Sequence, residues 1–125
     1  MASATILVVD DDPDFVEIMR TILVSRGYRV ITAANGAQAL RQVAEAQPDL
    51  MILDINMPEL NGLDFLKEFG KTPKAGKVPI IMLSTHTEKE IQDQAMSLGA
   101  RAFLTKPFQK PELQALVTGL TGQSL

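Results

Sequence analysis

Acidic side chains follow two of the apolar runs in this chain of 125 residues. Asp10 and Asp11 follow the run Ile6–Val9. Asp54 follows the run Leu50–Leu53. Carboxylates gathered at one place repel one another unless a cation lies between them. Magnesium prefers oxygen ligands and takes few protein carboxylates, so these residues predict a divalent-cation site if the fold brings the ends of the two runs together.

An amine and a hydroxyl extend this set. Lys106 follows the short apolar segment Ala102–Leu104, and Pro107 restricts it to extended geometry. Ser84 follows the run Pro79–Leu83. A carboxylate nucleophile, a cation and a fixed amine together are typical of phosphoryl chemistry.

Each of these residues also has a purely structural interpretation. Asp11 and Asp12 could cap the following helix. Asp54 and Ser84 could be turn residues. Lys106 could be a solvated surface lysine, which is the usual environment of lysine. The residues taken one at a time leave both interpretations open.

Strands and helices alternate along the chain, and they must position these side chains. Apolar or β-branched runs predict five strands, and residues at helical spacing predict a helix after each strand. Asp12-Pro13 and Asn35-Gly36 begin the first two helices, and the third runs from Gly62 to about Phe69. The fourth opens with the capping-box spacing Thr87-x-x-Glu90, the fifth begins at Pro111, and Leu120–Leu125 is a tail. The predicted strands are Thr5–Asp10, Tyr28–Ala33, Leu50–Leu53, Pro79–Leu83 and Ala102–Leu104.

This alternation predicts an α/β fold of the (βα)5 type. Five continuous apolar strands form a doubly wound parallel sheet with helices on both faces. We expect one domain over residues 1–125, with a core at about residues 5–120. Such sheets bind ligands beyond the carboxyl ends of their strands, where the acids, Ser84 and Lys106 lie in the sequence.

Composition excludes several classes of function. The chain has no cysteine and a single histidine, His86, so thiol chemistry and a multi-histidine metal site are impossible. The net charge of −3 gives no footprint for direct nucleic-acid binding. No apolar run approaches the roughly 20 residues of a membrane helix, and the first residues lack signal-peptide features. We therefore expect a cytoplasmic protein without membrane insertion.

At four motifs the sequence resembles the receiver domain of two-component response regulators, in particular the chemotaxis-regulator type. The resemblance covers the chain from Ile6 to about Leu120, and it implies a flavodoxin-like arrangement of the sheet. Each motif alone is weak, but their order and spacing together are specific. The motifs are ILVVDD (6–11), DLMILDINMPELNGLDF (49–65), PIIMLST (79–85) and GARAFLTKPF (99–108).

The resemblance implies a phosphoacceptor and a magnesium site. Asp54 would accept the phosphoryl group and contribute to binding Mg²⁺. Asp11 would bind Mg²⁺ directly, Asp10 mainly through water, and Asn56 through its main-chain carbonyl. Asn56 would also tune the lifetime of the phosphoryl group, as would His86 unless it is an ordinary loop residue.

The resemblance also implies a switch. Lys106 would pair with one phosphoryl oxygen and Ser84 would hydrogen-bond another, while Phe103 would turn inward. Two of these positions vary within the family pattern, since serine stands at 84 where threonine is common and phenylalanine at 103 where tyrosine is frequent. These movements would alter the surface of the fourth helix, the fifth strand and the fifth helix, roughly Thr87–Leu120. This surface would contact a downstream protein.

The implied partners are a histidine kinase or a histidine phosphotransfer protein as donor. The chain itself would be a monomer or a weak dimer. It would not be an enzyme, beyond self-catalysed phosphoryl transfer and slow autodephosphorylation.

Three other functions have to be considered, and the sequence lacks features that the first two require. An aspartyl-phosphate phosphatase of the haloacid dehalogenase type needs a second aspartate where Asn56 stands, together with a large cap. A nucleotide- or flavin-binding domain would carry a glycine-rich phosphate loop, which the sequence lacks. A receiver-like module that signals through protein contacts without phosphorylation remains the main alternative.

Overall fold

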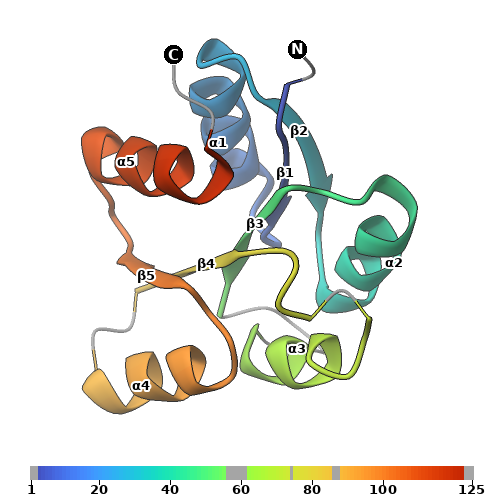
Figure 1. Ribbon diagram of the computed structural model, residues 1–125. Helices are drawn as coiled ribbons and strands as arrows, with labels where there is room; N and C mark the ends of the chain where they lie inside the picture. The colour runs from blue at the N-terminus through green and yellow to red at the C-terminus, as the bar shows by residue number, and fades with distance from the viewer. Residues whose placement is uncertain (1–2, 56–61, 74, 86–87, 123–125) are drawn as a thin grey trace.

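The computed structural model describes residues 3–55, 62–73, 75–85 and 88–122, and its strands form one parallel sheet (Figure 1). The strands lie in the order β2-β1-β3-β4-β5, and each neighbouring pair is parallel. The predicted doubly wound α/β fold is confirmed. The strands are β1 Thr5–Val9, β2 Arg29–Ala33, β3 Leu50–Asp54, β4 Ile80–Ser84 and β5 Ala102–Thr105.

Helices cover both faces of the sheet (Figure 1). Side chains of α1 and α5 form one core with the sheet, and side chains of α2, α3 and α4 form the other. This two-sided cover explains why the strands are apolar throughout rather than alternating. The helices are α1 Pro13–Ser25, α2 Gly36–Ala46, α3 Gly62–Phe69, α4 Lys89–Ser97 and α5 Lys110–Thr121.

Alternate residues of each strand enter different cores. Ile6 and Val8 of β1 pack on the side of α1 and α5, whereas Leu7 and Val9 pack on the side of α2, α3 and α4. All four side chains are at most 1% exposed. Burial of one such side chain contributes about 1.5–3 kcal/mol, so the two cores fix the position of the strand and of the residues that follow it.

Two helix starts form as the sequence predicts. The Asp12 side chain accepts a hydrogen bond from the Asp14 amide at 3.0 Å at the start of α1. The Asn35 side chain accepts one from the Gln38 amide at 2.9 Å at the start of α2. Both caps satisfy amides that the first turn of a helix leaves unpaired.

Three details at the later helices differ from the prediction. The predicted capping box is wrong, because the residue before α4 is Glu88 and its side chain makes no capping hydrogen bond; Thr87 itself lies outside the described residues. The last helix begins one residue before Pro111, since the first turn tolerates proline. Leu120 lies in this helix and packs against the core, as its helical spacing predicts, and the helix runs into the predicted tail as far as Thr121, before Gly122 with a φ of 73°.

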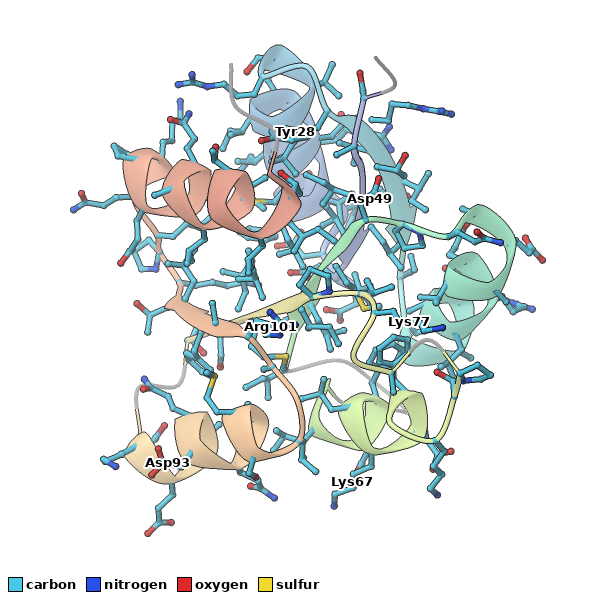
Figure 2. All side chains as sticks on the ribbon, viewed as in Figure 1. Tyr28, Asp49, Lys67, Lys77, Asp93 and Arg101 are labelled. Atoms are coloured by element: carbon cyan, nitrogen blue, oxygen red, sulfur yellow. The ribbon has the colours of Figure 1, made fainter. Side chains whose placement is uncertain are left out.

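Charged side chains on two of the outer helices point away from the cores. Lys67 on α3 and Asp93 on α4 project outward from their helices (Figure 2). Among the residues that the structure describes, no helix combines the length and the apolar character that a membrane crossing requires.

Candidate functional site

Four of the predicted site residues lie at the carboxyl ends of four strands, β1, β3, β4 and β5. Each is either the last residue of its strand or the residue that follows it. Asp10 directly follows β1, and Asp54 is the last residue of β3. Ser84 is the last residue of β4, and Lys106 directly follows β5. Because these strands are neighbours in a parallel sheet, their carboxyl ends lie along one edge.

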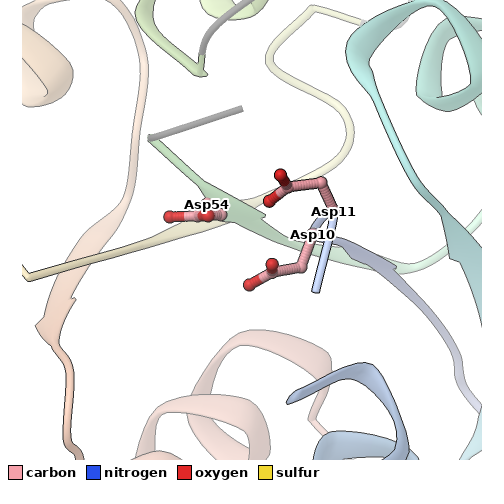
Figure 3. A group of neighbouring side chains, drawn as sticks. All are labelled: Asp10, Asp11 and Asp54. Carbon is pink, nitrogen blue, oxygen red and sulfur yellow. The ribbon is translucent and has the colours of Figure 1, made fainter. Parts of the chain in front are cut away.

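Three carboxylates meet at this edge. Asp10, Asp11 and Asp54 each offer an oxygen, and these oxygens all lie within 4.8 Å of one another (Figure 3). Asp10 and Asp54 are 3% and 6% exposed, whereas Asp11 is exposed. The core therefore fixes Asp10 and Asp54, whereas the cluster is open to solvent on the side of Asp11.

Lys106 is the amine of this cluster. Its Nζ lies 2.8 Å from Asp10 Oδ2 and 3.6 Å from Asp54 Oδ2. The Lys106 side chain is only 19% exposed, so this pairing is partly shielded from water. An ammonium beside two nearly buried carboxylates offsets part of their repulsion and of the cost of burying them.

Asp12 is a structural residue. Its carboxylate caps α1, and the described carboxylates that form the cluster do not include it. The Asp12 amide donates to Asp10 Oδ1 at 2.9 Å, so the start of α1 also orients Asp10. The structural interpretation is therefore correct for Asp12, while Asp11 lies with Asp10 and Asp54.

The remaining predicted residues lie on β4 and β5 or outside the described part. Ser84 is fully buried, and its main-chain carbonyl accepts a hydrogen bond from the Lys106 amide at 2.8 Å. Phe103 of β5 is partly buried against the core under α2, α3 and α4. Asn56 and His86 lie outside the described residues.

Two aromatic side chains at the site could not be assigned to it from the sequence. Lys106 Nζ lies 4.1 Å from the centroid of the Phe15 ring. Phe108 packs edge to face on Phe15, with ring centroids 6.1 Å apart. The signal was an aromatic residue two positions after Lys106 and another in the first turn after the acidic run, but helical spacing alone indicated only a core position for Phe15.

The residues of the cluster fit a divalent cation. Three carboxylates and one ammonium leave two negative charges, which a doubly charged ion would neutralise. Hard cations such as Mg²⁺ bind carboxylate oxygens, and an open side leaves room for water ligands. The donor set at the carboxyl ends of β1 and β3 therefore matches the chemistry of such an ion.

Comparisons with known proteins identify the family. The sequence model of the response regulator receiver domain matches residues 6–118. The chain belongs to this family. Receiver domains accept a phosphoryl group on an aspartate in two-component signalling.

Sequence and structural relatives agree with this assignment. The transcriptional regulatory protein KdpE of Mycobacterium tuberculosis is 42% identical over 110 residues, which are 88% of this chain and 47% of that protein. The chemotaxis protein CheY4 of Vibrio cholerae has a TM-score of 0.89 and 34% identity over 95% of this chain and 99% of that one. The receiver domain of the sensor histidine kinase PA1611 of Pseudomonas aeruginosa, solved with a magnesium ion in its active-site cleft, has a TM-score of 0.88 and 30% identity over 98% of this chain and 100% of that one. The chain spans about half the length of KdpE and of other curated regulators that it matches.

Proposed function

We propose that this receiver domain is a switch in which Asp54 accepts a phosphoryl group from a histidine kinase or a histidine phosphotransfer protein. The supporting observation is the position of Asp54, which ends the buried strand β3 within 4.8 Å of two other carboxylate ligands and 3.6 Å from Lys106 Nζ. A carboxylate in this place is fixed by the sheet and has positive charge available beside it.

In the transfer step, an oxygen of Asp54 forms a bond to phosphorus. The bond between phosphorus and the donor imidazole nitrogen breaks, and the nitrogen keeps the electron pair. Asp10, Asp11 and Asp54 would hold Mg²⁺, with Asn56 as a further candidate ligand through its main-chain carbonyl. The bound ion would supply positive charge beside the transferring group.

Lys106 changes partners during this step. In the unphosphorylated state its ammonium lies closer to Asp10 than to Asp54. The phosphoryl group adds nearly two negative charges next to Asp54. The ammonium then pairs with a phosphoryl oxygen, which stabilises the product.

Phosphorylation changes the conformation of residues on β4 and β5. Ser84 lies at the end of β4, next to Thr105 in register, and its carbonyl binds the Lys106 amide. Its hydroxyl turns to the phosphoryl group, and Phe103, which pairs with Met82 in register, turns inward. The two conformations are states of one equilibrium, which phosphorylation shifts.

The output surface, where a downstream protein binds, comprises α4, β5 and α5, about residues 87–120. Hydrolysis resets the switch, as water attacks phosphorus and Asp54 leaves as a carboxylate. Asn56 and His86 tune the rate of this slow reaction. The chain is otherwise not an enzyme, and it acts in the cytoplasm as a monomer or a weak dimer.

Intact-mass spectrometry tests this proposal. The wild type is incubated with acetyl phosphate and Mg²⁺, alongside the Asp54→Asn variant and a sample with chelator. We expect one added phosphoryl group on the wild type and none in the two controls. A wild type that stays unmodified, even when quenched before hydrolysis can remove the adduct, would contradict the proposal and favour a module that signals without phosphate.

A further inference from the structure

The ammonium of Lys106 lies between carboxylates and an aromatic ring. Its Nζ is 2.8 Å from Asp10 Oδ2, 3.6 Å from Asp54 Oδ2 and 4.1 Å from the centroid of the Phe15 ring. A ring face carries partial negative charge and attracts a cation within about 6 Å. Phe15 therefore attracts the ammonium electrostatically rather than only filling space.

The position of the Phe15 ring is itself fixed. Phe15 lies in the first turn of α1, directly after the segment that carries Asp10 and Asp11. Phe108 contacts it edge to face at 88°, and both rings pack against the core under α1 and α5. Edge-to-face pairs are a favoured aromatic geometry, so helix α1 and the segment between β5 and α5 that carries Phe108 together hold the ring against Lys106.

We infer that Phe15 is a positioning residue that keeps the Lys106 ammonium at the phosphorylation site. Lysine has a long, flexible side chain that loses conformational entropy when its amine is fixed. The ring lowers the free energy of the fixed conformation and leaves the ammonium beside Asp54, ready for the incoming phosphoryl group. This inference rests on the proposed role of Lys106 and Asp54.

An aliphatic side chain at position 15 would fill similar space without attracting the cation. The Phe15→Leu variant should therefore lower the rate of phosphorylation by acetyl phosphate about three- to tenfold, which is the size expected for a partly buried cation–π contact. The Phe15→Tyr variant keeps a ring face and should stay within about twofold of the wild type. The affinity for Mg²⁺ should not change in either variant, because the ring contacts Lys106 and not the carboxylates assigned to the ion.

A matched control applies the same change elsewhere. Phe69 stacks on Phe65 in the core under α3, with ring centroids 5.8 Å apart. The Phe69→Leu variant should keep the wild-type phosphorylation rate at temperatures where it is folded. Equal rates in the wild type and the Phe15→Leu variant would overturn the inference, as would failure of tyrosine to preserve the rate.

A double-mutant cycle distinguishes action through Lys106 from a general packing effect. In a Lys106→Met background, which lacks the ammonium, Phe15→Leu should cause no further loss of rate. A loss as large as in the wild-type background would show that Phe15 acts by another route and would overturn the inference.

Nuclear magnetic resonance of the unphosphorylated protein separates this inference from the proposed function. Because the ring lies under the ammonium, the ε-methylene protons of Lys106 should resonate upfield in the wild type and in Phe69→Leu, and not in Phe15→Leu. Ordinary lysine shifts in the wild type would overturn the inference even if Asp54 is phosphorylated. Upfield shifts without any phosphorylation would instead overturn the proposed function and leave the contact between Phe15 and Lys106 established.

Discussion

The apolar residues of the strands and the charged residues at the carboxyl ends differ in chemistry although they are neighbours in the chain. Val9 and Leu53 are at most 1% exposed and pack in an apolar core. Asp10 and Asp54, the next residues along the chain, are also nearly buried but carry charge. Within the described residues, no buried side-chain nitrogen or oxygen lacks a hydrogen-bond partner.

This difference teaches how stability and function are divided in the sheet. The apolar strand residues stabilise the fold and position the charged ends, whereas the charged ends cost stability because like charges are held together. Lys106 reduces this cost, and a bound cation would reduce it further. Changes of the apolar strand residues should therefore alter stability most, and changes of the charged residues at the ends should alter ion binding and phosphorylation most.

The largest effect on stability is expected at a buried apolar residue of β3, directly before its charged end. The Leu53→Ala variant should lose about 2–5 kcal/mol of unfolding free energy, because it leaves a cavity in the core. Chemical denaturation measures the change. Val24 of α1 is 52% exposed, so Val24→Ala serves as the control and should change stability by no more than about 0.5 kcal/mol. Equal effects at the two positions would contradict the assignment of Leu53 to the core.

A second effect concerns the ion at the strand ends. Mg²⁺ at 100 times its dissociation constant should stabilise the wild type by about 2.7 kcal/mol, since it binds only the folded state. Thermal unfolding with and without Mg²⁺ measures this. The Asp11→Asn variant should lose most of the stabilisation, whereas Asp12→Asn should keep it because Asp12 caps α1. The same response in both variants would place the ion elsewhere.

A third prediction concerns Gly62, where the start of α3 lies against the carboxyl end of β3. A Cβ at this position would lie 2.7 Å from the Asp54 carbonyl oxygen and 2.7 Å from Ile55 Cα. An alanine here would therefore force the start of α3 away from the end of β3. We expect Gly62→Ala to cost about 1–3 kcal/mol of stability and to slow the phosphorylation of Asp54.

The control for Gly62 is Gly119 in α5, where a Cβ would meet nothing within 4 Å. Gly119→Ala should stabilise the protein by about 0.5–1 kcal/mol, because alanine favours the helix. If Gly62→Ala were equally stabilising, the close approach of α3 to the end of β3 would be wrong. Denaturation curves and acetyl phosphate kinetics on both variants give the comparison.

The smallest effect should come from the cap of α1. Asp12→Ala should lower stability by about 1 kcal/mol, because the Asp14 amide loses its acceptor. Asp12→Asn should recover most of this loss, since asparagine is an equally good cap. Denaturation of both variants without Mg²⁺ measures the cap alone, and similar losses in the two would contradict it.

The alternation of strands and helices could be predicted from the sequence because the strands are apolar on both faces and the acids stand at their ends. The meeting of Asp10 and Asp54 followed from the parallel sheet, which places the carboxyl ends of β1 and β3 side by side. The start of α1 could also be predicted, since Asp12 and Pro13 form a local signal.

Details that depend on tertiary contacts could not be predicted in the same way. Helical spacing indicated that Phe15 faces the core, but the contact with Lys106 joins residues far apart in the chain. The capping-box spacing at Thr87 failed because local patterns permit several starts for α4, and the structure begins that helix after Glu88. Periodicity identifies the face of an element and leaves open which atoms meet on it.

The most direct test of the central claim locates the phosphoryl group on the chain. Protein phosphorylated with acetyl phosphate and Mg²⁺ is reduced with sodium borohydride, which converts an aspartyl phosphate into homoserine, and the peptides are sequenced by tandem mass spectrometry. We predict homoserine at position 54 alone, and none after chelation. Homoserine at Asp10 or Asp11, or at no position, would contradict the assignment of Asp54 as the phosphoacceptor.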